Sequence, residues 1–240
     1  MQKTKQNSQR GLFLIVAAIA VVLAVVLFVF LRPKPEAADP AADPAAGARF
    51  VFGSPSAKVT IVDFSNYLCP HCADHALRNV PEIFRDYVDT GKVRYVFRDF
   101  PFTGQDNVIR AGEAAACAAD AGRYRDYHEV LFRAQRLWGG LSGPALDQFL
   151  IDLASQLGIP AGPFADCLRS GSKRAGVLAD RDLTTRLALR GTPTFYVNGQ
   201  LYDDGYVPYD KWKERIENAL AGKTSPPAQG GESTPAPKQP

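Results

Sequence analysis

The hydrophobic pattern divides the 240-residue chain into an apolar block near the start, a mixed central region and a polar end. Residues 12–31 are twenty consecutive apolar residues without charge, glycine or proline. As an α-helix, such a block would be about 30 Å long, which matches the hydrocarbon core of a bilayer. We therefore predict a transmembrane anchor at residues 12–31, preceded by a cytoplasmic N-terminus at residues 1–11.

The charges around this block indicate how it crosses the membrane. Lys3, Lys5 and Arg10 precede it, and cytoplasmic segments are enriched in Lys and Arg, so the remainder should lie outside the cytoplasm. Arg32 and Lys34 follow directly and weaken this asymmetry. A cleaved signal peptide is the alternative, although its apolar region is normally shorter, about 7–15 residues. Both interpretations export the domain.

Low-complexity segments flank the part of the chain that should fold. Residues 32–48 are rich in Pro and Ala and should form an extended linker. Residues 222–240 contain five prolines and no aromatic or branched apolar residue, so we expect a disordered tail there. The folded domain should then cover residues 49–221.

Two β-branched runs inside this domain predict a βαβ unit. Residues 58–64 and 92–99 have the composition of buried strands. Between them, a helix should begin at Cys69 or Pro70, since Pro is favoured at the first helical position, and continue to about Thr90. Strands joined by such a crossover are parallel.

The pattern then becomes helical over a long insertion, about residues 104–189. Periodic, Ala-rich stretches separated by Gly and Pro predict helices at residues 108–121, 124–137, 144–157, 163–170 and 173–189. Strand signals resume at 194–197, turn at Asn198-Gly199 and return at 200–202, before a last amphipathic helix at 208–220. The predicted fold class is α/β, a small mixed sheet interrupted by helices.

Composition and charge exclude some functions. The formal net charge of +3 is mild and dispersed, without a basic stripe interleaved with aromatics, so we expect no nucleic-acid binding. Four cysteines are too few for a disulfide-dense scaffold, so the fold should rest on a packed core. The cysteines are thus available for chemistry or for one structural bridge.

The strongest chemical signal is Cys69-Pro70-His71-Cys72, which follows a predicted strand and opens a helix. Two cysteines on the first helical turn can close a disulfide without moving the backbone. Unpaired N–H groups and the helix dipole stabilise a thiolate at Cys69, and His71 can add a cation or a donor. A stabilised thiolate is a good leaving group. We therefore expect a substrate to attack Cys69, and Cys72 to be the resolving thiol.

A metal site is the competing interpretation. Cys69, Cys72 and His75 have a spacing that zinc could use, but a structural site needs a fourth ligand. His128 stands alone, and the remaining cysteines are not paired in sequence. An exposed polar residue one turn past Cys72 is the simpler interpretation of His75. We favour redox chemistry and expect no metal.

Three segments together resemble a known family. Val59–Phe64, Cys69–Cys72 and Gly191–Phe195 are similar to the corresponding motifs of the DsbA-like branch of the thioredoxin superfamily. The resemblance covers essentially the whole folded domain. It implies a thioredoxin-like fold with a helical insertion and a redox-active Cys69–Cys72 disulfide without any other cofactor.

Further site residues have both a family interpretation and an alternative. In this family the proline matching Pro193 is cis, which would expose the backbone of Thr192 to an extended substrate; an ordinary trans proline starting an edge strand is the alternative. Asp63 matches a position where the superfamily often has a buried acid. Desolvation there would raise its pKa and let it exchange a proton with Cys72. A solvated Asp at the strand's end is the alternative.

Cys117 and Cys167 both fall in the helical insertion. Export favours a disulfide between them, which would close a loop of about 51 residues and stabilise the fold by roughly 4 kcal/mol. Two separate buried thiols or a second, regulatory redox pair are the alternatives.

These patterns predict a membrane-anchored thiol–disulfide oxidoreductase that oxidises cysteine pairs of unfolded, exported proteins. The family resemblance implies reoxidation by a membrane quinone-linked partner of the DsbB or VKOR type. We expect a monomer in a bacterial cell membrane, with the catalytic domain on the periplasmic or outer side. An extracytoplasmic reductase or isomerase is the alternative, and a metal-delivery module using Cys69, Cys72 and His75 is a third.

Overall fold

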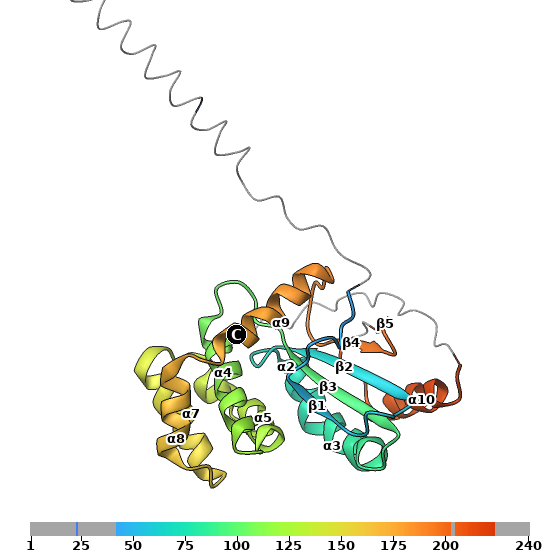
Figure 1. The fold of residues 1–240 in the computed structure, drawn as a ribbon, viewed down its shortest axis with the longest axis horizontal. Coiled ribbons are helices and arrows are strands. Elements are labelled where there is room, and N and C mark those ends of the chain that lie inside the picture. The colour runs from blue at the N-terminus through green and yellow to red at the C-terminus, as the bar shows by residue number, and fades with distance from the viewer. Residues whose placement is uncertain (1–22, 24–41, 203–204, 224–240) are drawn as a thin grey trace, which may run out of the picture. The chain divides into compact units, whose positions relative to one another are not determined.

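Within the described residues, five strands form one mixed sheet in the order β1-β3-β2-β4-β5 (Figure 1). The structure is a computed structural model that describes residues 23, 42–202 and 205–223 of the chain. The strands are β1 (Phe50–Phe52), β2 (Val59–Ser65), β3 (Val93–Asp99), β4 (Thr194–Val197) and β5 (Gln200–Tyr202). The predicted α/β architecture is confirmed.

The two β-branched runs form the centre of the sheet. Strands β2 and β3 pair in parallel, from Val59 opposite Val93 to Ser65 opposite Asp99. Strand β4 pairs with β2 and β1 with β3, both antiparallel. The carboxyl ends of β2 and β3 therefore meet at one edge of the sheet, where the chain enters the loop before Cys69.

The segment after β2 is helical in four consecutive parts. These are α2 (Pro70–Asp74), the π-helical turn η1 (His75–Asn79), α3 (Val80–Ile83) and a second π-helical turn η2 (Phe84–Val88). The crossover helix predicted between the two strands is thus confirmed. Gly91, with a positive φ of 74°, then lets the chain reverse into β3.

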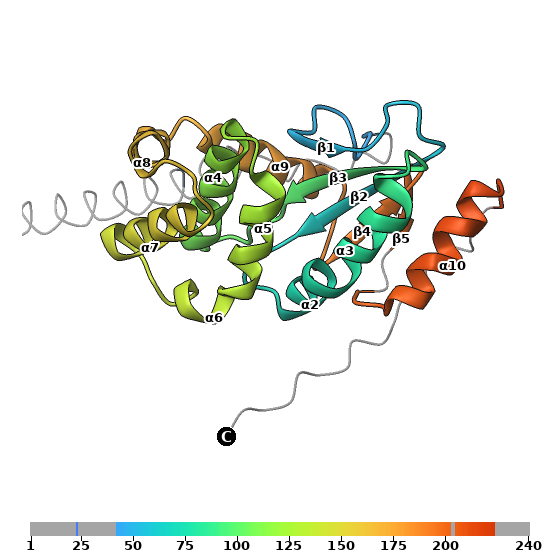
Figure 2. The ribbon, with the colours of Figure 1, turned by 90° about the horizontal axis from the view of Figure 1, so that it is seen from below.

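The predicted insertion is also helical. Its elements are α4 (Asp106–Asp120), α5 (Tyr124–Arg133), α6 (Gln135–Trp138), α7 (Gly143–Gln156), α8 (Ala161–Ser170) and α9 (Arg174–Arg186). The expected helix at 124–137 is divided into α5 and α6 at Ala134, whose ψ of 6° departs from helical geometry. Helices α4, α5, α7 and α8 gather beside the carboxyl ends of β2 and β3 (Figure 2).

Alternate residues of β2 contribute to two hydrophobic cores. Val59 and Ile61 belong to the larger core, which includes residues of α3 and of the last helix, α10 (Tyr209–Leu220). Val62 and Phe64 pack in the second core, with Leu183 of α9. Helices α3 and α10 thus cover one face of the sheet and α9 the other (Figure 2). Because side chains alternate along a strand, Asp63 points into the larger core.

The β4–β5 hairpin has the predicted tight turn. Asn198 and Gly199 both have positive φ, 50° and 76°, as a two-residue hairpin loop requires. On its other side β4 pairs with β2, and this pairing brings the segment before β4, which contains Thr192 and Pro193, to the end of β2.

Strand β1 was not predicted from the sequence. It has only three residues, and Gly53 ends it with a φ of 88°, at a position where a Cβ would lie 2.3 Å from the carbonyl oxygen of Val93. Packing also extends in front of the expected boundary at residue 49, because the Arg98 guanidinium donates to the carbonyl oxygens of Pro44 and Ala46.

No helix within the described ranges is long and apolar enough to cross a membrane. The expected anchor at residues 12–31 lies outside the described residues apart from Leu23. The N-terminus at 1–11, residues 32–41 of the expected linker and residues 224–240 of the expected tail also lie outside them.

Candidate active site

Cys69 and Cys72 lie at the start of α2, and both are free thiols. Cys69 is the N-cap residue, in extended conformation, and Pro70 occupies the first helical position, where its missing N–H has no cost. Cys69 is half-buried, whereas Cys72, one turn deeper, has no exposed surface. The two thiols are therefore in different environments.

The environment of Cys69 favours its thiolate. Hydrogen bonding from the Cys72 thiol is the largest effect, and it lowers the pKa of Cys69 to about 6 against the opposing effect of burial. The Thr192 side chain and the backbone N–H groups of Cys72 and His71 also stabilise the thiolate. The side chains of Pro70 and His71 are themselves exposed. His71 thus acts on Cys69 through its backbone.

The environment of Cys72 has the opposite effect. Burial raises its pKa well above the ordinary value, and the nearby Cys69 and Asp63 raise it further. The backbone N–H of Asn66 lies 3.5 Å from its Sγ and opposes these effects. At neutral pH the pair is thus a thiolate at Cys69 beside a protonated Cys72.

The segment before β4 contacts the exposed sulfur. The Thr192–Pro193 peptide bond is cis, and Sγ of Cys69 lies 3.2 Å from the carbonyl oxygen of Thr192, to which it donates a hydrogen bond when protonated. Pro193 is buried. The structure therefore brings Thr192, with the cis proline that follows it, beside Cys69.

Asp63 is a buried acid, not a solvated strand end, because only 1% of it is exposed. Desolvation raises its pKa to about 6, although hydroxyl groups bind both carboxylate oxygens. Ser65 donates to Oδ1 at 2.5 Å and Tyr95 donates to Oδ2 at 3.0 Å. A group with this pKa can both take up and release a proton near neutral pH.

His75 is not the exposed residue that its polarity suggested. It is completely buried, and burial lowers its pKa to about 3, so that the imidazole is neutral. Its ring nitrogens face Tyr95 and Asn79, not the cysteines. Among the described residues, no group of three or more His, Cys, Asp or Glu side chains is arranged to hold a metal ion.

Three polar side chains that sequence reasoning missed hold the loop between β2 and α2. The Asn66 side chain donates to the Phe100 carbonyl at 2.8 Å and to the Gln105 side chain at 2.7 Å. Gln135 of α6 donates to the carbonyl oxygens of Tyr67 and Cys69, at 2.7 and 3.1 Å. Asn66, a turn-forming residue between a strand and a helix, carried a sequence signal. Gln105 and Gln135 carried none, because their contacts are remote in sequence.

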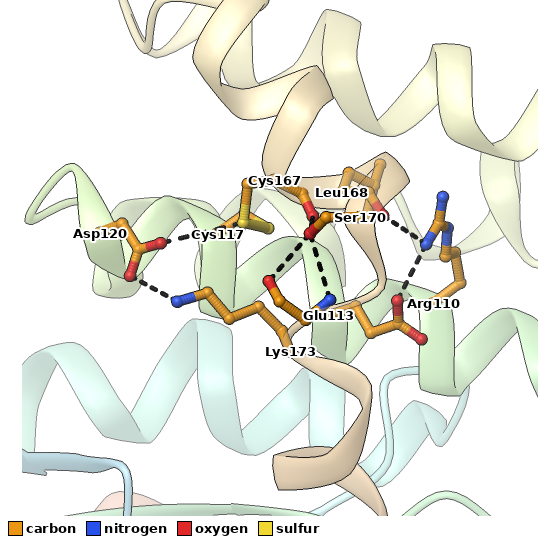
Figure 3. Close-up of a disulfide and its surroundings, with 9 residues drawn as sticks. Arg110, Glu113, Cys117, Asp120, Cys167, Leu168, Ser170 and Lys173 are labelled. Carbon is orange, nitrogen blue, oxygen red and sulfur yellow. Dashed lines mark hydrogen bonds and ion pairs between the residues drawn. A yellow bond between two sulfur atoms is a disulfide. The ribbon is translucent and has the colours of Figure 1, made fainter.

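Cys117 of α4 and Cys167 of α8 form a disulfide within the helical insertion (Figure 3). Polar contacts surround it: Lys173 pairs with Asp120 at 2.7 Å, and Arg110 donates to the Leu168 carbonyl at 2.7 Å. The bridge therefore joins helices that side chains also hold together. It is separate from the Cys69–Cys72 pair in its elements and contacts.

A family model described as Thioredoxin matches residues 45–218. Disulfide bond formation protein D of Bacillus subtilis is 31% identical over 181 residues, 72% of this chain and 78% of that protein. A Rickettsia prowazekii protein named as a protein-disulfide oxidoreductase is 29% identical over 175 residues, 72% of this chain. The chain spans only 56–63% of the length of the Rickettsia relatives that it matches.

Solved structures show the same fold. Oxidised BdbD of Bacillus subtilis is similar with a TM-score of 0.62 and 27% identity, over 79% of this chain and all of that one. Alpha-DsbA1 of Wolbachia pipientis has a TM-score of 0.63 at 21% identity, over 75% of this chain and 97% of that one, a likeness of fold alone. Both support the thioredoxin-like architecture with a helical insertion.

Proposed function

The chain belongs to the thioredoxin family, and from this membership we propose that it is a protein dithiol–disulfide oxidoreductase acting through Cys69 and Cys72. In this proposal its oxidised form accepts two electrons from a pair of cysteines in an unfolded, exported protein. The redox-active disulfide is the cofactor, and no metal takes part.

The observation that carries the proposal is the difference between the two thiols. The pKa of Cys69 is lowered to about 6, whereas burial raises that of Cys72. A thiol with a low pKa is the better leaving group, and the half-buried sulfur is the one that a protein substrate can reach. Stabilisation of the Cys69 thiolate favours the reduced form, which makes the disulfide form an oxidant.

The reaction follows from these positions. A substrate thiolate attacks Sγ of Cys69 in the Cys69–Cys72 disulfide, so a mixed disulfide forms and Cys72 leaves with the electron pair. Cys72 then takes up a proton. A second substrate thiolate attacks the substrate sulfur of the mixed disulfide and releases Cys69 as a thiolate. The substrate gains one disulfide, and the enzyme disulfide becomes a dithiol.

Two further residues have roles in this proposal. Asp63 exchanges the proton of Cys72, since its pKa of about 6 suits transfer near neutral pH and its charge acts on that thiol. Thr192 provides backbone groups to an extended substrate, because its carbonyl oxygen is adjacent to the sulfur that would be linked to the substrate. Cys117 and Cys167 form a structural bridge.

The proposed location follows from the sequence. Residues 12–31 would anchor the domain in a bacterial cell membrane, with the domain on the extracytoplasmic side, whether periplasmic or outer. A membrane quinone-linked protein of the DsbB or VKOR type would reoxidise Cys69–Cys72. We propose that the chain acts as a monomer.

The test is the reduction potential of the full-length chain against glutathione, together with oxidation of a reduced, unfolded protein. We expect a potential well above the value of about −270 mV that is typical of thioredoxin, and stoichiometric substrate oxidation that is lost in Cys69→Ser. A potential near −270 mV would instead support a disulfide reductase. Tight stoichiometric zinc or copper without dithiol oxidation would overturn the enzyme assignment.

A further inference from the structure

A chain of hydrogen bonds between buried side chains leads from Asp63 to the segment before α10. Tyr95 donates to Asp63 Oδ2 at 3.0 Å, and His75 Nε2 lies 2.9 Å from the Tyr95 hydroxyl. His75 Nδ1 lies 3.2 Å from Asn79 Nδ2, which also donates to the carbonyl oxygen of Val207 at 2.7 Å. The side chains of the four polar residues come from β2, β3 and η1, and each residue is at most 1% exposed.

Asn79, at the far end of this hydrogen-bonded chain, determines which atom donates in each of its hydrogen bonds. A carbonyl oxygen only accepts, so the atom of Asn79 facing Val207 must be the amide nitrogen. The same nitrogen faces His75 Nδ1, which must therefore be an acceptor without a proton. Since the buried imidazole is neutral, its one proton lies on Nε2 and is donated to the Tyr95 oxygen. The Tyr95 proton is then left for Asp63.

The reverse direction is blocked. If a protonated Asp63 donated to Tyr95, the Tyr95 hydroxyl would have to donate to His75 Nε2, and the imidazole proton would move to Nδ1. That proton would face the amide nitrogen of Asn79, which cannot accept it. A flipped Asn79 amide would place its oxygen against the Val207 carbonyl.

We propose that Asn79, His75 and Tyr95 are positioning residues that hold one hydroxyl proton on Asp63 Oδ2 and close this side of the carboxylate to proton exchange. The inference rests on the proposed function, because it concerns how Asp63 serves the Cys72 thiol. A proton that Asp63 takes up therefore does not pass into this hydrogen-bonded chain, and its exchange is left to the sides of the carboxylate that face Cys72 and Ser65.

Among the described residues, four titratable groups contact Asp63 or act on it. From α2 and its cap these are Cys72 and Cys69, from η1 His75, and from β3 Tyr95. On β4 the residue paired with Asp63 is Phe195, which has no proton to exchange. Within the part of the chain that the structure describes, the ionisable neighbours of the carboxylate are therefore the two cysteines, Tyr95 and His75.

The first test uses the unmodified full-length chain in its reduced form. The carboxyl carbon signal of Asp63 gives the pH range in which this residue titrates. Throughout that range, nitrogen NMR should show that His75 has the Nε2–H tautomer. The Nδ1–H tautomer, or a change of tautomer as Asp63 gains its proton, would overturn the proposal.

The second test uses matched variants and the same carboxyl signal. Tyr95→Phe should raise the pKa of Asp63 by about one unit, because a donor to the charged form is lost. His75→Phe should give a smaller rise in the pKa of Asp63. His75→Gln, which keeps a donor, should leave this pKa close to its value in the unmodified protein. The control is Tyr127→Phe, which removes a buried hydroxyl bound to the Leu150 carbonyl and should cause no shift.

The outcomes separate the two claims. If the pKa of Asp63 were unchanged in both Tyr95→Phe and His75→Phe, the proposed role of the hydrogen-bonded residues would be overturned, even if the unmodified protein oxidises dithiols. Failure of the unmodified protein to oxidise dithiols would contradict the proposed function, whatever the tautomer of His75.

Discussion

The Sγ atom of Cys69 lies 3.2 Å from the carbonyl oxygen of Thr192, although 123 residues separate them in the chain. The antiparallel pairing of β4 with β2 makes this possible, since it aligns Thr194 with Phe64 and so brings the segment before β4 to the end of β2. The whole helical insertion lies between these strands in the sequence. The pairing of β4 with β2 therefore brings Thr192 to Cys69. The insertion adds separate contacts to the loop of Cys69, such as those of Gln135.

Replacing Thr192 by Val should raise the pKa of Cys69. The Thr192 side chain stabilises the thiolate by hydrogen bonding, and Val has a similar shape without a donor. A hydrogen bond to a charged group contributes at least about 1.5 kcal/mol, which corresponds to a rise of roughly one unit. Ultraviolet absorbance of the thiolate against pH measures it. An unchanged titration would show that the hydroxyl has no part in activating Cys69.

Replacing Asp63 by Asn should make the reduced protein more stable at high pH. Burial raises the pKa of Asp63 from about 3.8 to about 6, so the folded state binds the proton more tightly than the unfolded state. Stability from this group is thus fully present below pH 4 and is lost as the pH rises through 6. Two units correspond to roughly 3 kcal/mol, the upper limit of the gain expected in Asp63→Asn at pH 8.

Urea unfolding of both reduced proteins between pH 4 and pH 8 measures this difference. The gain should disappear toward pH 4, where both proteins are neutral at this position. Asp89→Asn, which changes an exposed carboxylate, is the matched control and should leave the pH dependence as it is. A constant difference between Asp63→Asn and the unmodified protein across this range would contradict the assignment of a buried, titrating acid.

Much of the fold could be predicted because its signals are local. The runs at β2 and β3, the Pro70 helix start and the Asn198-Gly199 turn each specify their own structure within a few residues. Strand β1 could not be predicted, because three residues are too few to show an alternating pattern and the strand exists through its pairing with β3.

The same limit applies to the site. Cys69 and Cys72 were found because they form a motif, and Asp63 because it matches a position where the thioredoxin superfamily often has a buried acid. His75 was misjudged because its polarity suggested exposure, whereas its partner Tyr95 lies 20 residues away on β3. Gln135 was missed because nothing near it in the sequence reveals that α6 begins beside Cys69.

Removing the disulfide of the insertion should lower stability without changing the redox pair. The bridge closes a loop with a sequence separation of 50, which contributes about 4 kcal/mol in the chain-entropy model. Cys117→Ala/Cys167→Ala should therefore unfold at lower denaturant concentration, with the alkylation rate of Cys69 unchanged. A thiol count in Cys69→Ser/Cys72→Ser provides the check: two free thiols after denaturation would contradict the bridge.

Replacing Gln135 by Leu should loosen the active-site loop from the insertion. The Gln135 amide donates to the carbonyl oxygens of Tyr67 and Cys69. The Cys69 carbonyl keeps the Ala73 N–H as a donor, so the cost of roughly 1–3 kcal/mol falls mainly on the partly buried Tyr67 carbonyl. Because Cys69 belongs to the restrained loop, amide hydrogen exchange should rise at residues 67–69 more than elsewhere in the chain. Gln148→Leu is the control, since that amide binds only the exposed Asp152 side chain. If exchange rose equally in both variants, or uniformly across the domain, the contact would be one of general stability and not a restraint on the loop that carries the reactive cysteine.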